Sequence, residues 1–174
     1  MEVKKLIYSI KIIRVIFFAL GVFSLSSFAA ITPYITLVDN LSFGEILGLP
    51  GSCYLAHDTK EVIDSAGSLC PAQESEGGTP GKFILYANAN KQVNIKIKNK
   101  INDGDGLSFT ADGVYSVSGL PDITILPNQF QLIDTGSTGI IIITIGGTLT
   151  SSIQQNFSSS YNLNVIDGIE FFEL

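Results

Sequence analysis

The most constraining feature of this sequence is the alternation of apolar and polar residues that recurs along the chain after residue 30. It is clearest in KFILYANANKQVNIKIKNK, where Val93, Ile95 and Ile97 alternate with polar residues. A period of two places successive side chains on opposite faces of a β-strand, so that one face is buried and the other meets water. Almost no segment here shows the 3.6-residue period of an amphipathic helix. The chain is therefore expected to be all-β.

The predicted strands are short, and turn signals separate them at a spacing of roughly ten residues. They cover residues 34–46, 82–87, 92–98, 107–110, 114–117, 122–127, 129–134, 139–150 and 159–174. We interpret Ala111-Asp112-Gly113 as a turn between two strands, and Gly146-Gly147 as a bend or a close approach of two backbones. So many short strands favour an antiparallel β-sandwich of the immunoglobulin-like or pilin-like kind, with a small β-barrel as the alternative.

The first thirty residues have a different composition, which is typical of a secretory signal peptide. Basic residues precede the apolar run VIFFALGVFSL, and a stretch of small residues follows it. Ser27 and Ala29 supply the small side chains wanted before a cleavage site, so cleavage is expected after Ala29. An uncleaved membrane anchor is the alternative, but the apolar run is shorter than the ~20 residues that span a bilayer. We expect residues 1–29 to be a cleaved signal peptide and residues 30–174 to be a single exported domain.

The charge of the predicted mature chain argues against two classes of partner. After Ala29 the sequence has six lysines, no arginine and fifteen acidic residues, a formal charge of 6 − 15 = −9. Such a surface repels the phosphate groups of nucleic acids and of anionic lipids. We therefore expect neither nucleic-acid binding nor membrane attachment after signal cleavage.

Residues 48–81 are predicted to form a long, exposed loop rich in Gly, Ser and Pro, with one helical turn or a short strand at most. The loop contains both cysteines of the chain, Cys53 and Cys70. An even number of cysteines in an exported chain favours a disulfide, which would hold so long a loop in place. A zinc site is the alternative, but the chain offers only one histidine and no CxxC pair.

The stretch GSCYLAHDTK holds the only histidine, His57, which precedes Asp58 and follows Cys53 by four residues. A cysteine nucleophile with His57 as its base would need a free thiolate, which a disulfide removes. Serine catalysis has no better support, because no serine lies in a G-x-S-x-G elbow. We expect a loop histidine beside a disulfide, no catalytic residues and no enzyme activity.

Asp103 and Asp105, in the stretch NDGDG, resemble the start of a calcium-binding loop. The further oxygen ligands of such a loop do not follow at the required spacing, and turn chemistry explains these residues without an ion. A glycine-rich phosphate loop and a dinucleotide fingerprint are missing as well. The sequence therefore predicts no metal and no cofactor.

Four short motifs follow one another in a characteristic order along the predicted mature chain. They are Phe43-Gly44 near its start, Gly81-Lys82-Phe83 on a strand, the run Gly146-Gly147-Thr148-Leu149, and Tyr161 at the opening of the last strand. In this order and spacing, residues 41–165 resemble the bacterial domain of unknown function 4402 family. The chain departs from that pattern after Tyr161, where a glycine two residues later is typical, and it extends past Val165. The resemblance implies an exported β-sandwich of Gram-negative bacteria that is similar to fimbrial subunits, and it implies no catalytic residues.

Two functions are open on these grounds. The first is a structural or adhesive protein of the periplasm or surface of a Gram-negative bacterium, such as a fimbrial or pilus subunit. Its partners would be other copies, pilus subunits and a periplasmic chaperone. Ala30–Asp39, anchored by Ile31, Ile35 and Leu37, could then be a strand donated to a neighbour. We favour the simpler interpretation that it is the first strand of its own sheet. The second function is a soluble periplasmic or secreted binding module of unknown ligand.

Overall fold

The structure is a computed structural model that describes residues 30–67, 69–70, 77–102, 106–154 and 159–174. The chain divides between Ala30 and Ile31, and Ile31–Leu174 is one compact unit. The predicted signal peptide, residues 1–29, lies outside the described residues and stays a prediction.

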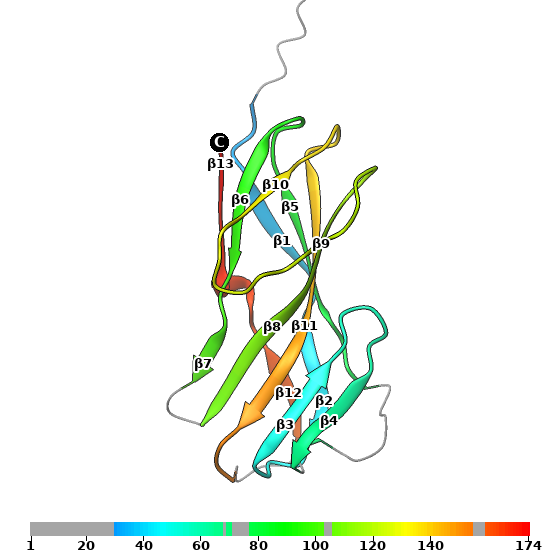
Figure 1. Cartoon of the computed structure of the whole chain (residues 1–174), viewed down its shortest axis with the longest axis vertical. Coiled ribbons are helices and arrows are strands. Elements are labelled where there is room, and N and C mark those ends of the chain that lie inside the picture. Colours follow the sequence, from blue (N-terminus) through cyan, green and yellow to red (C-terminus); the bar gives the residue numbers. More distant parts are fainter. Residues whose placement is uncertain (1–29, 68, 71–76, 103–105, 155–158) are drawn as a thin grey trace, which may run out of the picture. The chain divides into compact units, whose positions relative to one another are not determined.

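Ile31–Leu174 is built of antiparallel strands, and its described residues contain no α-helix. An eight-stranded sheet contains β1 (Tyr34–Asp39), β3 (Gly51–Leu55), β4 (Val62–Gly67), β5 (Gly81–Tyr86), β7 (Lys100–Asn102), β8 (Leu107–Val117), β9 (Ile123–Thr124) and β11 (Ile140–Ser151). A three-stranded sheet contains β6 (Gln92–Ile97), β10 (Gln131–Asp134) and β13 (Ile169–Glu173), and β2 (Leu41–Ile46) pairs with β12 (Ser159–Leu163). A single 3₁₀ turn, η1 (Ile166–Gly168), leads into β13 (Figure 1).

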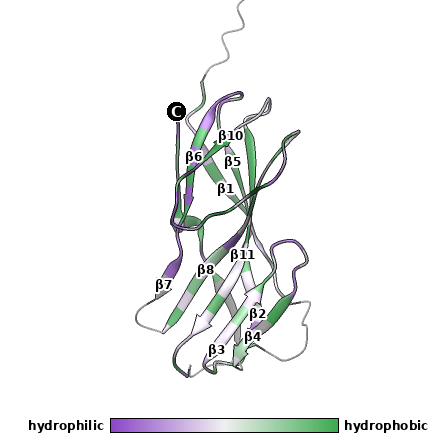
Figure 2. Ribbon diagram, viewed as in Figure 1, coloured by the Kyte–Doolittle hydropathy of each residue, from purple (hydrophilic) through white to green (hydrophobic). Residues whose placement is uncertain are grey.

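The sheets enclose one apolar core. Val93, Ile95 and Ile97 are fully buried, as the alternation predicts, and hydrophilic and hydrophobic positions follow one another along β6 in Figure 2. Phe43 of β2 meets Phe109 of β8 edge to face, with 6.1 Å between the ring centroids. The predicted antiparallel β-sandwich is confirmed, and the alternative of a small barrel is wrong because the sheets do not close on themselves.

Strand β11 organises the eight-stranded sheet. One edge pairs with β8 from Ile141 to Ser151, while the other edge pairs first with β5 and then with β3. The change of partner falls at Gly146, where a Cβ atom would lie 2.2 Å from the Leu55 carbonyl oxygen. The close backbone approach predicted for the Gly146-Gly147 pair is therefore present, and it lets two strands share one edge of β11.

The turn predicted at Ala111-Asp112-Gly113 is wrong, because β8 runs straight through it as one strand of 11 residues. The three residues pair with Gly147, Gly146 and Ile145 of β11. Gly113 is needed for close packing here, since a Cβ atom would lie 2.0 Å from the Thr144 carbonyl oxygen. A sequence that is typical of a turn is thus held extended by pairing with a distant strand.

The predicted long loop at residues 48–81 is also wrong over much of its length. It contains β3 and β4, which form a hairpin, and β3 is an interior strand between β4 and β11. Cys53 and Leu55 point into the core while their neighbours on β3 are half-buried. The apolar residues on this strand are few and glycines border it, so its alternation is short and easily mistaken for loop.

The first strand, β1, pairs with β5 of its own sheet, as we favoured. It is an edge strand whose predicted anchors are shallow: Ile35 packs against the core, whereas Ile31 and Leu37 are each 43% exposed. A register shift between Leu37 and Asp39 marks a bulge near its end. Such bulges commonly re-aim a side chain or end the pairing of an edge strand.

Candidate interaction surface

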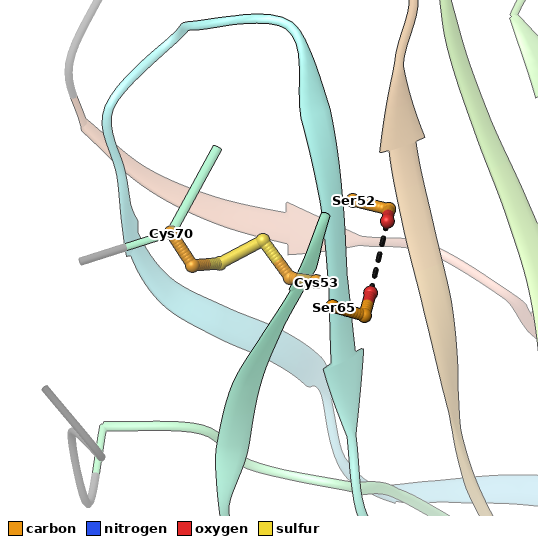
Figure 3. The surroundings of a disulfide bond; sticks show 4 residues. All are labelled: Ser52, Cys53, Ser65 and Cys70. Atoms are coloured by element: carbon orange, nitrogen blue, oxygen red, sulfur yellow. Dashed lines mark hydrogen bonds between the residues drawn. A yellow bond between two sulfur atoms is a disulfide. The ribbon is translucent and has the colours of Figure 1, made fainter. Parts of the chain in front are cut away.

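Cys53 and Cys70 form a disulfide, as the cysteine count predicts (Figure 3). The bond joins β3 to the segment that follows β4, and the hydroxyls of Ser52 on β3 and Ser65 on β4 hydrogen-bond to each other at 2.9 Å. Both cysteines are buried within the apolar core. The expectation that the bond lies in an exposed loop is therefore wrong, because the hairpin that carries it is part of the sandwich.

His57 and Asp58 follow the end of β3, and neither joins a catalytic arrangement in the described part of the chain. The Nδ1 atom of His57 is buried without a hydrogen-bond partner. Cys53 is not a free thiolate because it is in the disulfide. Within the described residues no group of three His, Cys, Asp or Glu side chains could hold a metal ion. Asp103 and Asp105 lie outside those residues, so their predicted turn stays a prediction.

A different set of residues gathers on the outer side of the three-stranded sheet. In one row across β10, β6 and β13, Leu132 and Phe172 both lie opposite Asn94. In the next row Phe130, just before β10, lies beside Lys96, because the Lys96 ammonium sits 4.4 Å from the centre of the Phe130 ring. The rings of Phe130 and Phe172 meet edge to face at 5.5 Å. We call this surface the three-strand face; it consists of Phe130, Leu132, Phe172, Leu174, Asn94, Lys96, Lys98 and Glu170.

Four large apolar side chains of the three-strand face are exposed. Phe130, Leu132 and Phe172 are 48%, 49% and 47% exposed, and Leu174 at the end of the chain is 61% exposed. The opposite side of the same strands carries the buried residues Val93, Ile95 and Ile133. Single exposed apolar residues are ordinary, but a contiguous group rimmed by polar residues marks an interaction site.

The charged groups of the three-strand face form one network. The Glu170 carboxylate pairs with the ammonium groups of both Lys96 and Lys98, which holds its pKa below the ordinary value. Two positive charges thus share one negative charge on this face. Lysine over an aromatic ring and salt bridges at a rim steer binding and fix orientation more than they add stability.

The sequence prediction missed this surface. The signal is present in QLID and IEFFE, where apolar residues stand next to each other and therefore point to both faces of a strand. One of the two faces must be the core and the other must be exposed or covered by a partner. Which face is which depends on the packing of the sheet, and the alternation alone does not reveal it.

A helix long and apolar enough to cross a membrane is not found among the described residues. Comparison of the chain with models of protein families, with curated proteins and with solved structures finds no match. The resemblance to the domain of unknown function 4402 family accordingly stays a prediction.

Proposed function

We propose that this protein is an exported structural or adhesive subunit that performs no catalysis and binds a second copy of itself through the three-strand face. The observation that carries the proposal is the group of exposed apolar side chains at Phe130, Leu132 and Phe172. Aromatic anchors surrounded by polar residues are the usual centre of a protein interface.

The charge of the chain supports a second copy as the occupant. Two of the six lysines that follow Ala29, Lys96 and Lys98, belong to the three-strand face, and Lys91 and Lys100 lie within a few residues of β6 in the sequence. The rest of the sequence after Ala29 has two lysines, Lys60 and Lys82, against a large excess of acidic residues. The face is thus complementary in charge to other surfaces of the same chain, and complementary potentials favour association and set its orientation.

This complementarity favours head-to-tail contact. Two copies that met through identical three-strand faces would bring together two surfaces that each carry Lys96 and Lys98 against the single carboxylate of Glu170, and so a net positive charge on both sides. A contact between two different surfaces avoids this repulsion, and when its rotation does not close it builds a filament rather than a dimer. A filament suits a structural or adhesive role at the cell surface.

The compartment in the proposal is the periplasm or surface of a Gram-negative bacterium. The signal-peptide pattern of residues 1–29 and the resemblance to fimbrial-subunit-like proteins support it. The Cys53–Cys70 disulfide is compatible with an oxidising compartment outside the cytoplasm.

Sedimentation of the purified mature protein over a range of concentrations tests the proposal. We expect a series of oligomers that grows with concentration, together with filaments in electron micrographs. Leu132→Ser and Phe172→Ser should each shift the distribution toward monomer, because each removes an exposed apolar contact. The thermal unfolding of both variants should stay close to that of the parent protein, since surface changes are nearly neutral for stability.

Leu120→Ser is the matched control, because it makes the same chemical change away from the three-strand face. Leu120 follows β8 and is 43% exposed. The control variant should leave the oligomers intact. A parent protein that stays monomeric at all concentrations would refute self-association. A closed dimer that forms instead of a series would refute head-to-tail assembly.

A further inference from the structure

A polar hollow lies where β11 changes its pairing partner. Gly147 of β11 pairs with Leu55 at the end of β3, and Ile145 pairs with Gly81 at the start of β5. The chain turns away from β11 after Leu55 and returns to it at Gly81, which leaves an opening in the outer side of the eight-stranded sheet. The opening is a feature of the fold itself, because Gly146 fixes where one strand leaves and the other arrives.

The hollow has a volume of about 290 Å³. It is lined by Asp39, His57, Asp58, Lys60, Thr79, Pro80, Lys82 and Thr144. All but Pro80 carry a polar or charged side chain. Ligand sites for drug-sized molecules begin near this volume, so a hollow of this size suits a small polar molecule.

The four charged side chains of the hollow form no ion pairs among the described residues. Lys60, Lys82, Asp39 and Asp58 make no ion pair with another described residue. Asp39 is nevertheless brought opposite Lys82 across the β1–β5 pair, and the register shift of β1 lies directly before it. The bulge thus places Asp39 across from Lys82 at the wall of the hollow, which both residues line.

Two further irregularities occur at the same place. Lys60 has a φ of 64°, which is unusual for a residue other than glycine. His57 keeps its Nδ1 atom buried without a partner, although nearly all buried polar atoms in folded proteins have one. Strained backbone and unsatisfied polar groups concentrate at binding sites, where the surrounding structure holds them in position.

From this arrangement we infer that the hollow binds a small zwitterion, a molecule that carries one carboxylate and one ammonium group, such as a free amino acid. The ammonium groups of Lys60 and Lys82 face the ligand carboxylate, and the carboxylates of Asp39 and Asp58 face the ligand ammonium group. Thr144 offers a hydroxyl to either. A ligand of a single charge would leave half of these groups without a partner, and this site does not depend on association between copies.

The test is a titration of the mature protein with glycine and with L-serine, followed by NMR chemical shifts of backbone amides. We expect saturable shifts at residues around Asp58 and Lys82. Asp39→Asn and Lys82→Gln should each weaken binding about tenfold or more, because each removes a charged hydrogen-bonding partner. N-acetylserine and serine amide each lack one charge of the zwitterion. Their affinity for the parent protein should be no higher than the affinity of the two variants for serine.

Asp122→Asn and Lys91→Gln are matched controls, since they make the same charge changes outside the hollow and should leave the affinity unchanged. Each variant is compared after thermal unfolding shows that it is folded. The absence of saturable shifts with both amino acids would overturn the inference. Equal binding of serine amide, or of glucose as a neutral probe, would overturn the zwitterion as the ligand class.

Discussion

At the scale of single residues, Tyr115 is the least expected member of the core. It is the largest of the fully buried side chains, and its hydroxyl has no hydrogen-bond partner among the described residues. Burial raises the pKa of this hydroxyl well above its ordinary value. A polar group buried without a partner keeps its full desolvation cost, which is about 1–3 kcal/mol.

Replacing Tyr115 with phenylalanine should therefore stabilise the protein. The change removes only the hydroxyl and keeps the ring, so we expect the free energy of unfolding in urea to rise by about 1 kcal/mol. Tyr54→Phe is the control, because the Tyr54 hydroxyl donates a 2.7 Å hydrogen bond to Asp112 and its loss should lower stability. A lower stability for Tyr115→Phe would show that its hydroxyl has a partner.

The burial of individual residues was partly predictable from the sequence. Val93, Ile95 and Ile97 lie in the core because a period of two assigns them to one face of β6, and this needs no knowledge of the other strands. Phe130 and Leu132 have the same period and are exposed, since the other side of their strand carries Ile133 into the core. Local pattern fixes which residues share a face, and only the packing of the sheets decides which face is buried.

At the scale of elements, the β3–β4 hairpin shows how long-range pairing overrides local signals. Glycines at Gly51 and Gly67 border it, and such residues are typical of loops. The hairpin is stable because β3 pairs with β11 on one side and β4 on the other. The same cause keeps Ala111-Asp112-Gly113 extended within β8. In both cases the missing information is the identity of the partner strand.

We expect the disulfide to contribute more to the stability of the β3–β4 hairpin than the hairpin's other side-chain contacts do. Cys53 and Cys70 are 17 residues apart, and closing a loop of this length restricts the unfolded chain by about 3 kcal/mol. The double change Cys53→Ala and Cys70→Ala should lower the free energy of unfolding by about that amount. Alanine avoids placing a hydroxyl in the core, where both cysteines are buried.

The double change Ser52→Ala and Ser65→Ala is the matched control for the disulfide. It removes an exposed hydrogen bond between β3 and β4 and leaves the covalent link, so its cost should be about 1 kcal/mol or less. Urea unfolding of both double variants gives the comparison. Equal losses in the two would contradict a stabilising role of the disulfide beyond ordinary contacts.

At the scale of the whole compact unit, its two terminal segments are tied together by one side chain. The Asn88 amide exchanges two hydrogen bonds with the backbone of Ile31, just before β1. The same amide and the Asn88 backbone donate to the Glu173 carboxylate at the end of β13. Since β1 belongs to the eight-stranded sheet and β13 to the three-stranded sheet, Asn88 joins the two sheets at this end.

The hydrogen bonds between Asn88 and Glu173 should make the free energy of unfolding depend on pH. Hydrogen bonds from the Asn88 backbone and side chain lower the pKa of Glu173 below its ordinary value of 4.5. A lowered pKa in the folded state means that the carboxylate contributes stability above its unfolded pKa, and that this contribution is lost as the pH falls through the folded pKa. Between about pH 6 and pH 3 the parent protein should therefore lose more unfolding free energy than Glu173→Gln does.

Two further variants show whether Asn88 causes this dependence. Asn88→Ala removes the side-chain donor, so it should reduce the acid-dependent loss in the same direction as Glu173→Gln. Glu61→Gln removes one carboxylate from the turn between β3 and β4 and should leave the pH profile of the parent in place. Urea unfolding at several pH values measures all four proteins. If the parent and Glu173→Gln lose stability in parallel, the carboxylate at the end of β13 does not hold the terminal segments together, and the sheets must be joined at this end by the backbone contacts and the core alone.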